Sequence, residues 1–155
     1  MYKAKTLRAW AWGMIGIVGC MAATAGETQE YTGRVYADRT STLLPLGNGT
    51  GVMSIQVSGI STMSGNPPSV FLMRCAGLGL VDAEGKAASD VYCTFDESDN
   101  DTFDVKGKLV EGEGMLEVIG GSGRFAGATG SGKFQRTSTD GDKSAGIIQV
   151  KVKTK

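Results

Sequence analysis

The chain has 155 residues, which suits one domain with a buried apolar core once a processed segment is removed. It contains no histidine, which excludes Ser-His-Asp and Cys-His catalysis, histidine general bases and histidine zinc sites. Sixteen basic residues balance sixteen acidic ones, but three basic residues precede residue 9, so the remainder has thirteen against sixteen, a net charge of −3. Because no cluster of Lys and Arg could follow a phosphate backbone, we expect no nucleic-acid binding.

Residues 1–25 are predicted to be an export signal. The basic residues Lys3, Lys5 and Arg8 come first, an uncharged run follows, and small residues close the segment. A membrane-spanning anchor fits less well, because the run is at the lower length limit for a span and is rich in Gly and Ala.

Two cleavage sites for this signal stay open. Ala23–Ala25 forms an A-x-A site, with cleavage after Ala25. Ile17–Cys20 resembles a bacterial lipobox, in which Cys20 would be lipidated and become the first mature residue. We therefore expect an exported protein, either periplasmic or an outer-membrane lipoprotein, with one domain over residues 27–155. Any membrane contact would run through the lipid anchor at Cys20.

After the signal, apolar residues recur at every second position in short runs separated by Gly, Asn, Asp and Pro. This pattern predicts strands and turns. Regular spacing with short connections favours an all-β fold, an eight-stranded antiparallel meander closed into a small barrel, with a sandwich as the alternative. The strands are expected over residues 28–37, 50–60, 69–81, 88–96, 101–110, 113–119, 129–138 and 144–153.

The two cysteines outside the signal predict the register of one hairpin. If strands 69–81 and 88–96 turn around Glu84, Cys75 and Cys93 lie directly opposite each other, close enough for a disulfide. In an oxidising compartment such a pair is more often a disulfide than a metal site. We therefore expect a disulfide and no metal.

The next hairpin defines the inner face of the sheet. A turn centred on Asp99 pairs Phe95 with Phe103 and Cys93 with Val105. One face then carries Phe, Met, Cys and Val side chains, and the other carries charged and polar ones. We expect the apolar face to be the interior, because removing apolar side chains from water stabilises the folded protein.

Residues Gly127–Phe134, GATGSGKF, differ by one letter from the phosphate-binding pattern G-x-x-x-x-G-K-[ST]. That site needs a following helix and a hydroxyl for magnesium, whereas the following residues read as a strand and Phe134 cannot bind a metal. The match of GSGRFA, residues 121–126 directly before it, to a dinucleotide pattern lacks the βαβ context. We expect neither a nucleotide nor any other cofactor. Instead, Phe125 should plug a compact turn, and Gly130 and Gly132 should allow close backbone approach.

Three segments carry a resemblance to a known family. GGSGRFAGATG, residues 120–130, is similar to the glycine signature of allene-oxide-cyclase-like, calycin-type barrels, and RCAG (74–77) and YCTFDESDND (92–101) are similar to small exported bacterial members of unassigned role. The resemblance implies an eight-stranded barrel with a central apolar cavity. It does not imply cyclase activity, because fold alone does not settle function. No pocket residue of the family aligns to a position here.

The favoured function is non-catalytic binding of a small apolar or amphipathic ligand in the barrel. Eight strands leave an interior that side chains fill or that holds one small ligand. Seven residues are the expected ligand contacts: Met53, Phe71, Met73, Phe95, Phe103, Met115 and Phe134.

Two other functions stay open. An isomerase or cyclase of a hydrophobic substrate would need a shaped cavity with one or two polar groups. Glu117, as a buried carboxylate, is the first candidate for such a group, and Tyr31 is the second. Leu116 and Val118 compete with Glu117 for the interior face. A structural envelope lipoprotein anchored at Cys20 is the third function.

Overall fold

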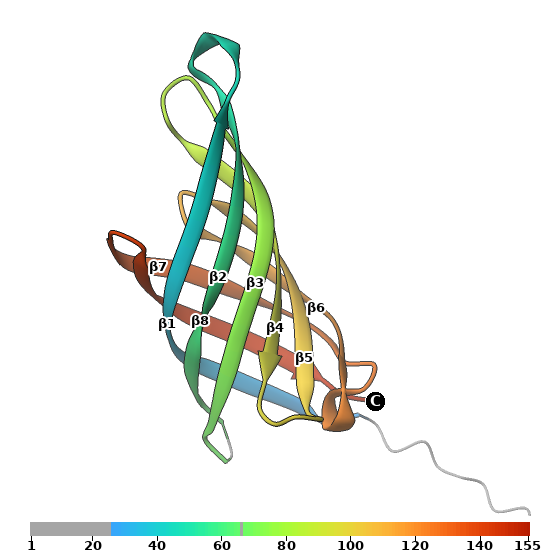
Figure 1. Ribbon diagram of the computed structural model, residues 1–155. Helices are drawn as coiled ribbons and strands as arrows, with labels where there is room; N and C mark the ends of the chain where they lie inside the picture. Colours follow the sequence, from blue (N-terminus) through green and yellow to red (C-terminus); the bar gives the residue numbers. More distant parts are fainter. Residues whose placement is uncertain (1–25, 66) are drawn as a thin grey trace, which may run out of the picture.

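The computed structural model describes residues 26–65 and 67–155; the expected signal, with Cys20, lies outside the described residues. The described chain forms eight antiparallel strands in meander order, and β1 pairs with both β2 and β8, which closes the barrel (Figure 1). The barrel expected from the sequence is confirmed. Across these residues no helix has the length and apolar character needed to cross a bilayer. The strands are β1 (Thr28–Pro45), β2 (Gly51–Ser64), β3 (Ser69–Val81), β4 (Ala87–Asp96), β5 (Thr102–Val110), β6 (Glu113–Ser122), β7 (Thr129–Asp140) and β8 (Lys143–Lys153).

The first hairpin is longer than its apolar alternation indicates. β1 continues to Pro45 rather than ending near residue 37, and β2 continues to Ser64. A short 3-10 helix, η1 (Gly47–Gly49), turns the chain between them. Figure 1 shows the tip of this hairpin projecting beyond the neighbouring turns. Most side chains near the tip are solvent-exposed, so no buried face imposes the period-2 pattern there.

The predicted registers of β3, β4 and β5 are confirmed. Cys75 and Cys93 are partners in the β3–β4 ladder and form a disulfide, with Cα atoms 4.0 Å apart. Phe95 pairs with Phe103 in the β4–β5 ladder. Side chains alternate between the two faces of a strand, so this register directs the Phe and Cys side chains inward together.

The glycine-rich segment is part of the barrel wall. Residues 129–134 lie in β7, which pairs with β6 and β8. Phe125 is 1% exposed and lies in a second 3-10 helix, η2 (Gly123–Phe125), at one end of the barrel. A Cβ at Gly132 would lie 2.3 Å from the carbonyl oxygen of Gln149, so the two backbones approach closely there. The turn-and-strand interpretation of this segment is therefore confirmed.

Candidate binding cavity

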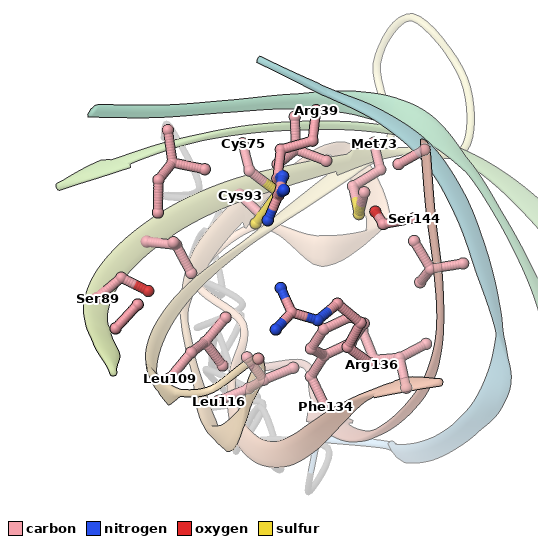
Figure 2. A pocket seen from close by; sticks show the side chains of 18 of the residues that line it. Arg39, Met73, Cys75, Ser89, Cys93, Leu109, Leu116, Phe134, Arg136 and Ser144 are labelled. Carbon is pink, nitrogen blue, oxygen red and sulfur yellow. A yellow bond between two sulfur atoms is a disulfide. The ribbon is translucent and has the colours of Figure 1, made fainter. Parts of the chain in front are cut away.

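A cavity of about 380 Å³ occupies one half of the barrel. It opens at the end formed by the β3–β4, β5–β6 and β7–β8 turns, where its lining includes Val81, Ala87, Gly112 and Ser144. Figure 2 shows the cavity from close by, with Ser144 among the labelled residues. Small-molecule sites in proteins have volumes of about 300–1,000 Å³. The cavity is therefore large enough for one small organic molecule.

The cavity walls are mostly apolar, because every strand contributes inward-facing aliphatic, aromatic or sulfur-containing side chains. Such a wall favours the burial of an apolar ligand by about 25 cal/mol for each Å² removed from water. The apolar wall residues are Val35, Ala37, Met53, Ile55, Val57, Met73, Cys75, Val91, Cys93, Phe95, Val105, Leu109, Leu116, Phe134 and Ile148.

An aromatic cluster fills the other half of the barrel and closes it. Phe95 and Phe103 stack with ring centroids 4.9 Å apart, and Phe103 packs edge-on against Phe71 at 5.4 Å and Phe125 at 5.3 Å. Tyr31 packs edge-on against Phe71. These side chains are at most 3% exposed. Phe95 also lines the cavity, so the cluster forms its floor.

Two arginines bring positive charge into this apolar cavity. Arg39 from β1 and Arg136 from β7, the two strands that flank β8, both line it, and Figure 2 shows their guanidinium groups extending into it. In the described part of the chain neither side chain forms a salt bridge, and Arg39 Nε is a buried nitrogen with no hydrogen-bond partner. Ser89 and Ser144 add hydroxyl groups to the lining.

The β5–β6 turn holds Arg136 in place. Glu111 and Gly112 have φ angles of 54° and 85°, as the two central residues of a type I′ turn do. Arg136 donates from Nη2 to the carbonyl oxygen of Glu111 at 2.8 Å, and from its backbone N–H to the carbonyl oxygen of Gly112 at 3.1 Å. The turn therefore fixes both the backbone and the side chain of Arg136.

A β-bulge directly after Arg136 ends the inward alternation of β7. The pairing with β8 shifts between Arg136 and Ser138, and Ser138 lies with the outward-facing Tyr36 on the outer surface. A bulge places two residues opposite one and so reverses which face the following side chains occupy. Arg136 is consequently the last side chain of β7 that lines the cavity.

Of the seven expected ligand contacts, Met53, Met73, Phe95 and Phe134 line the cavity. Phe71 and Phe103 are fully buried in the aromatic cluster. The expectation that Met115 faces the interior is wrong, because its side chain is 66% exposed on the outer surface. Whether the lining residues bind a ligand stays a prediction.

Neither catalytic candidate lies in the cavity. Glu117 is exposed on the outer face of β6, because Leu116 and Val118 take the inward positions and are at most 6% exposed. Tyr31 is buried at the closed end, where its hydroxyl donates to Gln29 Oε1. The structure therefore offers no buried carboxylate at Glu117.

Arg39 and Arg136 were not among the site residues predicted from the sequence. A signal was present, because Val35 and Ala37 precede Arg39 at two-residue steps, and Phe134 precedes Arg136 in the same way. Extending each inward alternation by one step would have placed both arginines in the interior. The predicted end of the first strand near residue 37 excluded Arg39 from consideration.

No known family model matches this sequence, and no curated protein is similar to it in sequence. Among solved structures, it is similar to the pterocarpan synthase dirigent protein GePTS1, with a TM-score of 0.58 and 11% identity over 97% of this chain and 99% of that one. It is also similar to the pterocarpan synthase dirigent protein PsPTS1, with a TM-score of 0.52 and 12% identity over 84% and 97% of the two chains. At this identity the likeness shows a shared eight-stranded barrel fold.

Proposed function

We propose that the protein binds one small, largely apolar or amphipathic molecule in the barrel cavity, and serves as a binding or substrate-orienting protein. The observation that carries the proposal is the combination of a closed aromatic floor, apolar walls and an open mouth around about 380 Å³. Apolar walls favour ligand burial, and a preformed cavity keeps the ordering cost of binding low. The likeness to the dirigent proteins GePTS1 and PsPTS1 supports the barrel fold and not the ligand. We include in the proposal that the chain is related to allene-oxide-cyclase-like barrels.

The cyclase alternative has no support in the cavity, because Glu117 lies outside the barrel and Tyr31 lies at its closed end. Catalysis by positioned acid or base groups requires them within hydrogen-bonding reach of the substrate. We therefore do not develop that alternative.

A cavity-filling pair of variants tests the binding proposal. Ala87 lines the cavity mouth, whereas the next residue, Ala88, is exposed on the outer face of the same strand. The neutral fluorescent probe N-phenylnaphthylamine should bind the wild-type protein and the Ala88→Phe variant equally. Ala87→Phe should weaken its binding by about tenfold or more, because the added ring occupies part of the cavity. Absence of probe binding, or equal binding by both variants, would contradict the proposal.

We also propose that the protein works outside the cytoplasm. The Cys75–Cys93 disulfide supports this, because disulfides persist in oxidising compartments. Fractionation of host cells that express the full chain, with and without Cys20→Ala, separates the alternatives. Loss of membrane association in the variant would support lipidation, release of a soluble wild-type protein would support cleavage after Ala25, and a purely cytoplasmic protein would overturn export.

A further inference from the structure

Among the residues that line the cavity in the described chain, three are charged: Arg39, Glu111 and Arg136. Glu111 does not neutralise the arginines in a shared ion pair. Its carboxylate accepts a hydrogen bond from the backbone N–H of Ala87 at 2.6 Å, and it forms no salt bridge within residues 26–65 and 67–155. The cavity mouth therefore carries two cations and one anion, a net positive charge.

Arg39 is costly for the folded protein unless an acceptor meets it. Its Nε is buried without a hydrogen-bond partner among the described residues, and an unsatisfied buried donor costs about 1–3 kcal/mol, more for a charged group. An apolar interior alone does not require a charged side chain at this half-buried position. The charge at this position is thus unexplained by packing.

The placement of the two guanidinium groups suits a planar oxyanion. Figure 2 shows the guanidinium groups of Arg39 and Arg136 extending toward each other within the ring of lining side chains, although their strands are separated only by β8. Arg136 is oriented by its bond to the Glu111 carbonyl, and among the described residues its other side-chain donors have no hydrogen-bond partner and can meet a ligand. Arginine presents its donors in a rigid fork that matches a carboxylate, and charge-assisted hydrogen bonds are the strong ones.

We propose that the ligand of the cavity is an amphipathic carboxylate, whose anionic group lies between Arg39 and Arg136 and whose apolar body packs toward Phe95. This inference rests on the proposed binding function and adds the chemical class of the ligand. The apolar walls and the aromatic floor bind the body of the ligand, whereas the two arginines set its orientation. A neutral molecule of the same shape gains only the apolar contacts with the walls and the floor.

The test compares two series of probes that differ in one group. Phenylalkanoates from phenylacetate to phenyldecanoate, and the matching phenylalkanols, are titrated into the purified protein by calorimetry. We expect the best carboxylate to bind about tenfold or more tightly than its alcohol, with an affinity that falls as salt is added. Arg39→Gln and Arg136→Gln should each remove most of this difference in affinity between a carboxylate and its matching alcohol.

Control variants separate charge from fold. Arg34→Gln removes an exposed arginine on the outer face of the same strand as Arg39 and should change neither series. Unchanged alcohol binding shows that a variant is folded; if Arg39→Gln does not fold, Arg39→Lys replaces it, since it keeps the charge but loses the planar fork and should retain only part of the preference.

The outcomes distinguish the two proposals. If alcohols and carboxylates bind equally and the arginine variants change neither, the carboxylate inference is wrong while the apolar binding function stands. If neither series binds, both are wrong. A carboxylate preference that survives both Arg39→Gln and Arg136→Gln would also overturn the assignment of the anionic group to these residues.

Discussion

The ring of Phe134 on β7 covers Gly146 on β8 so closely that a Cβ at Gly146 would lie 2.5 Å from two ring carbons. Phe134 lines the cavity, so this glycine determines how far the ring can retreat against the wall. Gly146 is therefore a residue that shapes the cavity without lining it.

We predict that Gly146→Ala destabilises the protein by about 1–3 kcal/mol, because the added methyl group overpacks this contact. In a Phe134→Ala background the cost should fall, since the ring is gone and only the carbonyl oxygen of Gln135, 2.9 Å from the added Cβ, still opposes it. Urea unfolding of the four proteins gives the coupling energy, which we expect at about 0.5–3 kcal/mol. Equal costs in both backgrounds would show that the ring is not what excludes the methyl group.

The sequence predicted the barrel well because its information is local. Each sequence signal constrains only neighbouring strands: the apolar alternation, the turn residues and the opposed pair Cys75 and Cys93. The observed β3–β4 and β4–β5 registers agree with these signals. Phe125 could be predicted as a plug in the same way, since compact turns rich in Gly need an apolar anchor.

The site was harder to predict because it depends on closure of the barrel. Arg39 and Arg136 come from the two strands that flank β8, and only the pairing of β1 with β8, which closes the barrel, brings these two strands near each other. The error at Met115 has a different cause. In β6 both alternate sets, Met115 with Ile119 and Leu116 with Val118, are apolar, so periodicity alone could not choose the inner face.

Removal of the disulfide should destabilise the barrel without changing its fold. Cys75 and Cys93 are 18 residues apart, and a closed loop of this size stabilises by about 3 kcal/mol in the chain-entropy model. We expect this loss in the Cys75→Ala, Cys93→Ala double variant, measured by urea unfolding. The wild-type protein should show a similar loss when a reductant is added, and the double variant should not respond to the reductant. If the reductant also destabilises the double variant, the loss of stability in the wild-type protein is not due to the Cys75–Cys93 disulfide.

Gly132, in the segment that resembles a phosphate loop, and Gly120, which lies before that segment, should respond very differently to substitution by alanine. A Cβ at Gly132 would lie 2.3 Å from the carbonyl oxygen of Gln149 and 2.9 Å from Val150 Cα, so β7 and β8 must move apart. At Gly120 a Cβ would meet nothing within 4 Å. We predict a loss of about 2 kcal/mol or more in Gly132→Ala, and a change within about 0.5 kcal/mol in Gly120→Ala, by thermal or urea unfolding. Similar losses in both would contradict the close approach of the two strands.

Tyr31 should make the stability of the closed end depend on alkaline pH. Its side chain is 3% exposed, and burial raises the pKa of Tyr31 above its ordinary 10.0; Glu97 also raises this pKa, while Arg124 opposes the rise. The folded protein then holds the phenolic proton more tightly than the unfolded chain does. The stabilisation is complete below pH 10.0 and is lost as the pH rises through the folded-state pKa.

We predict that Tyr31→Phe flattens the fall of the melting temperature between about pH 9 and pH 11, because a phenylalanine ring has no proton to lose. At neutral pH the same variant should lose about 1 kcal/mol, since the hydroxyl donates to Gln29 and accepts from Arg124 Nη2 at 3.4 Å. The matched control is Tyr36→Phe, which changes a tyrosine that is 47% exposed on the outer face of the same strand. Tyr36→Phe should not change the fall of the melting temperature at alkaline pH. If Tyr31→Phe and Tyr36→Phe give the same alkaline curve as the wild-type protein, ionisation of Tyr31 does not limit stability at alkaline pH.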